Sequence, residues 1–384
     1  MPMQVAVGHA FSVEGREAVA RAVYKARLVL GNVRINFAVV VASFEYDFEA
    51  VFSAAQTQIG DVPMIGFSTS GEFDTRGNHR RSVTVALVTD EALNVKTEWL
   101  PGFSDQSVSV ANQLVKNLGL TTQQQGLLFL VADGTKGDYE AMVNALPPGR
   151  YQLAGGLSGG DIRLENTYQM GGDQFGTGGL AGVFLSGSHV RVGIGNGLGW
   201  QSIGAHFRVT DVQGPLGRRL DNNPAFEGYA ALFGRQPRDW AFPPLNTLVR
   251  LYPLGIEQGG QPMLVRTPMR IDADGSLQMQ AAIPQDSIGH LLVGSREKCL
   301  TAAKEAARAA LEMVQGAQPK LALVLADVSW QIMFQGYEGT EIEAIREVLG
   351  EDVPLIGGYT FGQFHQMEVC TVTCDSPISC DIFV

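Results

Sequence analysis

The sequence has little cysteine, no long apolar run and no N-terminal export signal. Its four cysteines, Cys299, Cys370, Cys374 and Cys380, include no Cys-x-x-Cys pair. A disulfide framework is therefore excluded, and reduced thiols in a cytoplasmic protein are expected. Apolar runs such as residues 37–42 are far shorter than the roughly 20 residues that span a bilayer. The N-terminus lacks a basic stretch followed by an apolar core, which predicts no secretory signal.

Basic residues are also scarce. Lys and Arg number 28 against 39 Asp and Glu, which gives a net charge of −11. No segment gathers several Lys or Arg, which disfavours a surface for nucleic acid or for anionic membranes. Glycine is abundant instead, with 46 residues in no collagen-like period. This excess indicates tight turns and close approaches of main chain.

Helical periodicity appears in several segments, each with a start or stop signal. The predicted helices, with their capping residues, are 13–30 (Ser12), 296–315 (Ser295), 341–349 (capping box of Thr340 and Glu343) and 224–234 (Asn223). Short β-type runs lie between them, and residues 261–281 resemble a hairpin that turns at Asp274-Gly275. The predicted fold class is α/β, with mixed, largely antiparallel sheets and packed helices.

One motif occurs three times and consists of a glycine, a Ser or Thr three positions later, a second glycine, and then an acid or amide. The three copies, here called the first, second and third glycine corners, are 66–72, 155–161 and 357–363. Each corner follows a short apolar strand, and each is preceded, past a helical segment, by a longer apolar run. The predicted repeat is strand, helix, strand with a glycine corner, and strand, distributed over two sub-domains.

The three corners are predicted to rim one shared pocket. A bend between two glycines brings main-chain N–H groups, a hydroxyl and an acceptor close together, which could orient a small polar ligand. Polar residues that follow the apolar runs would join them, because α/β sheets present groups to ligands beyond their strand ends. The predicted ligand-binding residues are Ser68, Thr69, Glu72, Ser158, Asp161, Tyr359, Thr360, Gln363, Asp133 and Asp327. The alternative is that the glycines relieve strain and the polar side chains satisfy buried main chain.

Other motifs give weaker indications of chemistry. The string Gly156-Leu-Ser158-Gly-Gly160 matches a nucleophile elbow, so an acyl hydrolase or transferase that uses Ser158 or Ser68 is the rival hypothesis. An elbow requires a helix directly after it, however, and the residues after Gly160 resemble a strand or loop. The glycines at 193–199 lack both the spacing and the following helix of a dinucleotide site.

His365 differs from the other five histidines because it lies two residues after Gln363 of the third corner. In a strand this spacing puts both side chains on one face. If that face lines the pocket, the imidazole could be an axial ligand of haem iron, with Phe361, Phe364 or Met367 as apolar surroundings.

At the corners the sequence resembles the FIST family, a bacterial sensory module with N-terminal and C-terminal parts. The resemblance rests on 65–73, 199–204, 209–214, 220–229 and 354–363. It implies a small-ligand sensor that passes its state to a partner such as a histidine kinase or a diguanylate cyclase, with amino acids among the suggested ligands. A similar subgroup, the nitric-oxide-sensing NosP proteins, binds haem.

The resemblance implies two pseudo-similar α/β parts, a FIST N-terminal domain at 1–220 and a FIST C-terminal domain at 221–384, which meet around the pocket. The expected protein is a stand-alone, non-enzymatic, cytoplasmic sensor without a membrane span, which could form a homo-oligomer. Haem-based nitric oxide sensing and haem-free sensing of an amino-acid-like ligand both remain open.

Overall fold

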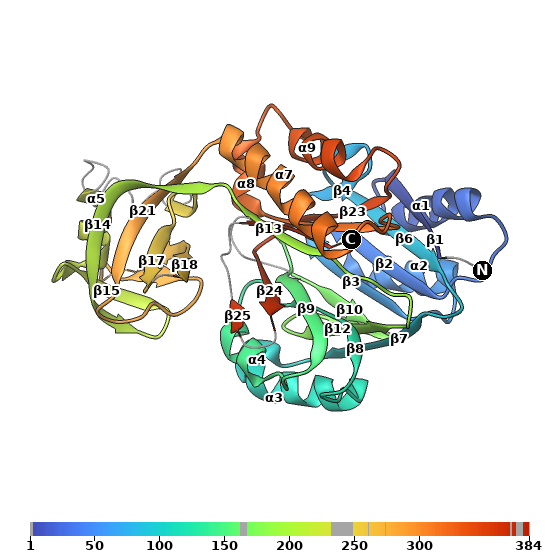
Figure 1. Ribbon diagram of the computed structural model, residues 1–384, viewed down its shortest axis with the longest axis horizontal. Coiled ribbons are helices and arrows are strands. Elements are labelled where there is room, and N and C mark those ends of the chain that lie inside the picture. The colour runs from blue at the N-terminus through green and yellow to red at the C-terminus, as the bar shows by residue number, and fades with distance from the viewer. Residues whose placement is uncertain are drawn as a thin grey trace. The chain divides into compact units, whose positions relative to one another are not determined.

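The computed structural model in Figure 1 describes residues 3–161, 167–231, 249–259, 261–272, 274–368, 371–373 and 379–383. The chain divides into two units. The first unit holds residues 1–197, 300–374 and 379–384, and the second holds 198–299 and 375–378. By compactness, therefore, the division does not fall at the predicted 220/221 boundary, because the second unit is an insertion in the first.

The first unit repeats one order of elements three times: strand, helix, strand, helical segment, strand, glycine corner and three more strands. The first repeat is β1 (Gln4–Phe11), α1 (Gly15–Leu30), β2 (Phe37–Ser43), α2 (Phe48–Ile59), β3 (Met64–Thr69), β4 (Glu72–Asp74), β5 (Gly77–His79) and β6 (Ser82–Thr89). The second is β7 (Asn94–Leu100), α3 (Phe103–Leu118), β8 (Gln125–Ala132), α4 (Tyr139–Ala145), β9 (Arg150–Leu157), β10 (Gln169–Gly171), β11 (Gln174–Gly176) and β12 (Leu180–Ser186).

The third repeat is β13 (Ile194–Leu198), α7 (Arg296–Met313), β22 (Ala322–Asp327), α8 (Val328–Met333), α9 (Thr340–Leu349), β23 (Leu355–Thr360), β24 (Gly362–Glu368), β25 (Thr371–Thr373) and β26 (Ser379–Phe383). In the sequence, most of the second unit lies between β13 and α7. The mixed α/β class and the repeated unit are thus as predicted, but all three corners lie in the first unit rather than in two sub-domains.

Each repeat builds most of one sheet, and the hairpin after the corner of another repeat completes it. The strand orders are β1-β6-β2-β3-β10-β11 in the first sheet, β7-β12-β8-β9-β24-β25 in the second and β13-β26-β22-β23-β4-β5 in the third. The exchange is cyclic, since the second repeat completes the first sheet, the third completes the second, and the first completes the third. Each sheet holds one parallel pair, β2–β3, β8–β9 or β22–β23, among antiparallel neighbours.

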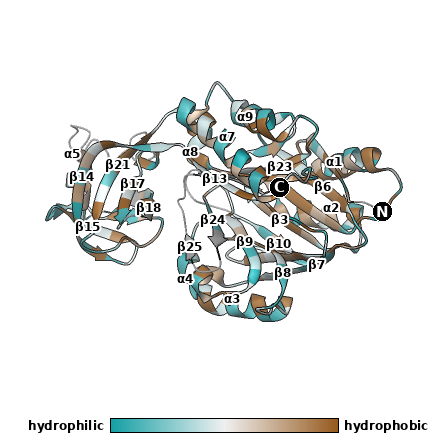
Figure 2. Ribbon diagram, in the orientation of Figure 1, coloured by the Kyte–Doolittle hydropathy of each residue, from teal (hydrophilic) through white to brown (hydrophobic). Residues whose placement is uncertain are grey.

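The central strands of the three sheets, such as β2, β3, β22 and β23, are buried on both faces. Their inner faces share one apolar cluster, to which Phe67, Phe129 and Leu325 contribute from the first, second and third sheets. On the outer face of the first sheet, α1 and α2 pack over residues such as Val85. The strand 82–89 is therefore buried throughout, although its apolar/polar alternation is typical of a half-exposed strand. Figure 2 accordingly shows hydrophobic colour along much of β2, β3 and β6.

The glycines at 193–197 have a packing role. An added Cβ at Gly193, Gly195 or Gly197 would lie within 2.0 Å of the main-chain oxygen of Ala310, Ala306 or Ala302, respectively. Two residues of a strand advance about 6.6 Å and four residues of a helix advance about 6.0 Å, so alternate glycines on β13 match every fourth alanine on α7. The pattern lets a helix lie directly on a strand.

The second unit is a mostly antiparallel β structure. It contains β14 (Trp200–Gln213), β15 (Leu216–Leu220), β16 (Asn223–Pro224), α5 (Ala225–Ala231), a 3-10 turn (Val249–Leu251), β17 (Leu254–Gln258), β18 (Gln261–Arg266), β19 (Pro268–Ile271), β20 (Leu277–Met279) and β21 (Ile288–Gly294). Phe207, Tyr229 and Ile256 are part of its core. The turn predicted at 274–275 joins β19 to β20, and the predicted helix end at Gly234 lies outside the described residues.

Two of the predicted caps are wrong and one is confirmed. Helix α1 begins after Glu14 without a side-chain cap, and Ser12 Oγ instead donates to Glu17 Oε2 at 2.5 Å. Helix α9 begins after Gly339, also without a side-chain cap, so the capping box is absent. Ser295 Oγ accepts from Lys298 N as an N-cap should. No helix in the described ranges has the length and hydropathy needed to cross a bilayer.

Candidate functional site

The three glycine corners meet inside the first unit, as the sequence predicts, and main-chain hydrogen bonds join each to the others. Gly159 N donates to Ser68 O at 2.8 Å, which joins the second corner to the first. Ser70 N donates to Tyr359 O at 3.0 Å and links the first corner to the third. Phe361 N donates to Leu157 O at 3.0 Å and closes the ring. At Gly159 an added Cβ would lie 2.2 Å from Tyr359 O, so this glycine is required by close contact.

The side chains of the corners are buried and bond to one another. Thr69 Oγ1 donates to Glu72 Oε1 at 2.8 Å in the first corner. Gln363 Nε2 donates to Thr360 Oγ1 at 2.7 Å in the third. Ser68, whose Oγ donates to Gly159 O, is likewise fully buried. The corners therefore form a packed polar junction, and their side chains line neither the apolar pocket around Phe37 nor the polar groove around Arg34.

In the second corner the equivalent of Glu72 and Gln363 is Gln169, whereas the sequence motif predicts Asp161. Gln169 Nε2 donates to Ser158 Oγ at 2.9 Å. The strand register agrees, because Glu72 pairs with Gly358, Gln363 with Gly156 and Gln169 with Phe67, each two residues before the corner hydroxyl. Asp161, the last residue of the second corner, is partly exposed. More residues separate the second corner from its next strand, β10, than in the other two repeats. The acid or amide side chain that reaches the corner hydroxyl is therefore Gln169 on β10 and not Asp161.

Glu72 is the acidic member of this threefold set and is fully buried. Its Oε2 accepts from Ser82 N at 3.0 Å and from Ser82 Oγ at 2.7 Å. Burial raises the pKa of Glu72 to about 8, although the hydrogen bonds from Ser82 and Thr69 act in the opposite direction. The carboxyl is therefore mostly protonated at neutral pH.

The predicted ligand residues Asp133 and Asp327 satisfy main-chain groups after their strands. Asp327 Oδ1 accepts from Ser329 N at 2.8 Å and caps α8. Asp133 Oδ1 accepts from Thr135 N at 2.9 Å. In the first repeat Ser43 Oγ has the same role towards Glu45 N. These contacts favour the structural alternative for both aspartates, and ligand contact by either stays a prediction.

Tyr359 of the third corner and His365, two residues after it, are also buried. Tyr359 OH donates to Glu341 Oε1 and accepts from Asn78 Nδ2 at 3.1 Å. His365 lies on β24 two residues after Gln363, as predicted, and pairs with Ala154 of β9. His365 lines neither the apolar pocket around Phe37 nor the polar groove around Arg34, and its role as a haem ligand stays a prediction.

Ser158 has the partners of a structural serine. Its Oγ donates to Ala132 O at 2.9 Å and accepts from the amide of Gln169. Neither a carbonyl nor an amide can take the hydroxyl proton, which a nucleophile must give to a base. A nucleophile elbow also requires a helix directly after Gly160. Asp161 is not helical, and residues 162–166 lie outside the described residues.

A hollow in the core lies at the other end of the sheets, where the parallel strands begin. This apolar pocket has a volume of about 420 Å³. Its walls come from all three sheets, with Phe37 and Ile65 from the first, Leu127 from the second and Leu323 from the third. The exposed side chains of Arg191 and Lys320 also line it. No pattern in the sequence distinguishes these core residues from others, so sequence reasoning missed them.

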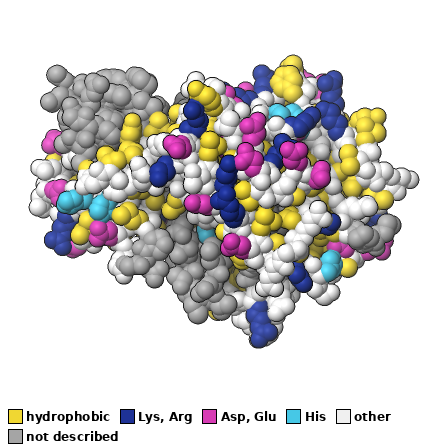
Figure 3. Space-filling view, turned by 45° about the horizontal axis from the view of Figure 1, so that its top comes forward, with side chains coloured by type: hydrophobic (Ala, Val, Ile, Leu, Met, Phe, Trp, Pro, Cys, Tyr) yellow, Lys and Arg dark blue, Asp and Glu magenta, His cyan; other side chains and the backbone are white. Residues whose placement is uncertain are grey.

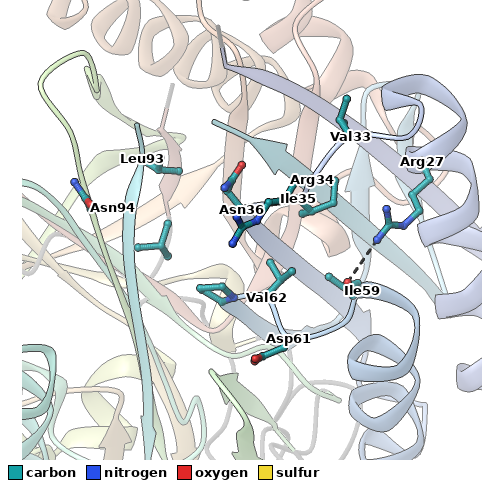
Figure 4. Close-up of a pocket in the computed structure, with 12 residues that line it drawn as sticks. Arg27, Val33, Arg34, Ile35, Asn36, Ile59, Asp61, Val62, Leu93 and Asn94 are labelled. Carbon is teal, nitrogen blue, oxygen red and sulfur yellow. Dashed lines mark hydrogen bonds between the residues drawn. The ribbon is translucent and has the colours of Figure 1, made fainter. Parts of the chain in front are cut away.

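A second hollow, here called the polar groove, lies beside the start of β2 and β3 (Figure 4). It has a volume of about 530 Å³ and includes Arg27, Arg34, Asn36 and Asp61. Arg27 Nη2 makes one long hydrogen bond of 3.5 Å to Ile59 O. Leu93 lines both the groove and the apolar pocket, so the two hollows adjoin.

The face of the molecule in Figure 3 shows no large basic patch of the kind that binds nucleic acid. There, acidic and basic side chains are interspersed over the surface, and no large patch of one sign is visible.

Comparison with known proteins gives a family but little more. Among solved structures the chain is similar to a cyanuric acid hydrolase from A. caulinodans, with 9% identity and a TM-score of 0.33 over 100% of this chain and 99% of that one. A second cyanuric acid hydrolase structure gives 9% identity and a TM-score of 0.30 with the same coverage. No curated protein matches the sequence.

The family models are informative. Residues 36–222 match the FIST N domain and residues 225–366 match the FIST C domain. Their junction lies close to the predicted family boundary at 220/221. The matches confirm the resemblance seen in the glycine corners, whereas membership of the NosP subgroup stays a prediction. The chain belongs to the FIST family, whose domains are small-ligand sensory domains of signal transduction.

Proposed function

We propose that this FIST protein senses a small molecule with an apolar body and an anionic group. The apolar pocket of about 420 Å³ carries the proposal, because ligand sites are concave, mostly apolar and supplied with a few polar groups. The ligand's apolar body would lie against Phe37, Ile65 and Leu127, where burial contributes about 25 cal/mol per Å². This site replaces the glycine corners as the leading candidate.

The polar groove supports an anionic head group. Arg27 and Arg34 both line it, and a guanidinium can bind a carboxylate through two parallel hydrogen bonds. Asp61 lines the same groove and could accept from an ammonium group. An apolar amino acid is therefore a second member of the proposed ligand class, in keeping with the family resemblance.

The proposed output is a change in a partner such as a histidine kinase or a diguanylate cyclase. Ligand binding changes such an output only if the ligand binds one conformation of the sensor more tightly than another. The proposal includes no chemical step, since the hydroxyl of Ser158 has no base among its described partners.

Calorimetric titration with decanoate and with phenylalanine tests the proposal. We expect one of them to bind the wild-type chain, and Arg34→Gln to weaken that binding at least five-fold. Arg16→Gln is the matched control, because Arg16 is exposed on α1 outside both hollows. Val88→Phe, which adds volume inside the apolar pocket, should weaken binding further.

Equal affinity in the wild type and in Arg34→Gln would refute the head-group assignment. Binding that survives Val88→Phe in a folded protein would refute the pocket itself. Haem is the competing ligand, and a Soret band in haem-reconstituted protein that disappears in His365→Ala would support it instead.

A further inference from the structure

We propose that His9, Asp74 and His79 form a binding site for a divalent transition-metal ion, with Zn²⁺ as the favoured occupant. His9 lies on β1 of the first sheet, and Asp74 and His79 lie on the β4–β5 hairpin, which completes the third sheet. The site would therefore tie two sheets together within the first unit. It is separate from the apolar pocket and the polar groove, which are lined by other residues.

The distances suit a metal after a small adjustment. His79 Nε2 lies 2.8 Å from Asp74 Oδ1, and His9 Nδ1 lies 3.9 Å from Asp74 Oδ2. One ligand atom from each residue lies within 4.8 Å of the other two. Tetrahedral Zn²⁺ with bonds of about 2.0–2.1 Å places its ligand atoms about 3.3 Å apart, so shifts on the order of 1 Å are sufficient.

The surroundings of His9 and Asp74 favour the protonation states in which these two groups bind a metal. Burial, together with the neighbouring His79, lowers the pKa of His9 to about 4, so its imidazole is neutral at pH 7. Burial alone raises the pKa of Asp74, but hydrogen bonds from His79 and Arg76 hold it well below its ordinary value. A neutral imidazole and a carboxylate can each bind a metal ion directly, because neither has to lose a proton first.

Arg76 shows that the cluster already attracts a cation. Its Nη2 donates to Asp74 Oδ2 at 2.7 Å and lies 3.1 Å from His9 Nδ1. Because a guanidinium keeps its protons, the lone pair of His9 Nδ1 must face it. The Arg76 side chain is 64% exposed, whereas that of Asp74 is 6% exposed, so the guanidinium can turn into solvent and leave Asp74 and the two partly buried histidines to a metal ion.

The cluster differs from the other histidine–carboxylate contacts. His189 pairs with Asp90 at 2.6 Å and His290 with Glu257 at 2.6 Å, each as one histidine and one carboxylate. Within the described ranges, His9, Asp74 and His79 are the only group of three or more His, Cys, Asp or Glu residues whose ligand atoms all lie within 4.8 Å of one another. The rings of His9 and His79 stack at 3.7 Å, which places two imidazoles on the same carboxylate. Three protein ligands leave one position for water or a further group.

Zinc titration of the full chain against a chromophoric chelator tests the site, after prior removal of metal with a stronger chelator. We expect one Zn²⁺ per chain, with affinity reduced at least ten-fold in His79→Ala and in Asp74→Asn. Arg76→Gln should raise the affinity, since it removes the competing cation. His189→Ala is the matched control and should bind as the wild type does, because its carboxylate partner has no second histidine.

Two results would overturn the proposal. One is wild-type affinity in folded His79→Ala, which would locate the zinc elsewhere. The other is the absence of Zn²⁺ binding at micromolar concentration in both the wild type and Arg76→Gln. If Asp74→Asn fails to fold, His79→Ala decides, because the His79 side chain is 25% exposed and its loss leaves the sheet intact.

Discussion

Replacing Glu72 by glutamine should stabilise the protein, and the gain should grow with pH. Glutamine already occupies the equivalent places in the other two corners, as Gln169 and Gln363. With the new side chain in the same orientation, its amide nitrogen would donate to Thr69 Oγ1 and its amide oxygen would accept from Ser82. The substitution keeps every hydrogen bond and removes a buried carboxyl that can ionise.

The magnitude follows from the two protonation states. Folding raises the pKa of Glu72 from 4.5 to about 8, so between these values the unfolded chain has lost the proton that the folded chain keeps. The contribution of Glu72 to the free energy of unfolding therefore falls as pH rises through this range, by about 1.4 kcal/mol per pH unit. The Glu72→Gln gain should grow from about 1 kcal/mol at pH 5 to about 4 kcal/mol at pH 8.

Urea unfolding of the wild type and the variant at pH 5, 6, 7 and 8 measures this difference directly. The matched control is Gln363→Glu, which adds a second buried carboxyl in the third corner and should destabilise the protein increasingly above pH 5. A difference between wild type and Glu72→Gln that stays constant from pH 5 to pH 8 would refute the reasoning, because the carboxyl would then titrate alike in both states.

Three other substitutions test the packing. Gly195→Val should cost about 3 kcal/mol or more, because its Cβ meets the main chain of Ala306, and a urea midpoint equal to that of the wild type would contradict the contact. Ser158→Ala should cost about 1–3 kcal/mol through loss of the hydrogen bond from Gln169 Nε2, yet leave ligand binding intact in calorimetry; loss of binding in a folded variant would return the corner to the ligand site. Asp327→Ala should lower stability by about 1 kcal/mol through loss of the α8 cap, and an unchanged thermal midpoint would argue against that cap.

The sequence predicts the repeated unit well because the repeat is local. Residues 37–42, 127–132 and 321–326 read as covered strands, and the structure has strands there. The helix 13–30 is likewise found within two residues of its predicted start. These strands and this helix are recognised from hydrophobic periodicity and from glycines at their ends. Both signals lie within a few residues of the element that they predict.

The site could be predicted only in part because its geometry depends on pairing between repeats. Motif spacing identifies Asp161, whereas strand register selects Gln169, and no local pattern reveals how many residues separate a corner from its next strand. His9 and Asp74 are 65 positions apart and meet only through strand exchange. His365 is singled out because it lies two residues after Gln363 of the third corner. The same spacing from Glu72 in the first corner would have identified Asp74.

The cyclic strand exchange has a consequence for synthesis on the ribosome. The first sheet can be completed once translation passes β11, but the second waits for β24 and β25 near the C-terminus. The β4–β5 hairpin is made early and has no partner until β23 emerges, more than 270 residues later. A nascent chain therefore presents unpaired sheet edges for most of translation, and a truncation before residue 362 would leave two of the three sheets unfinished.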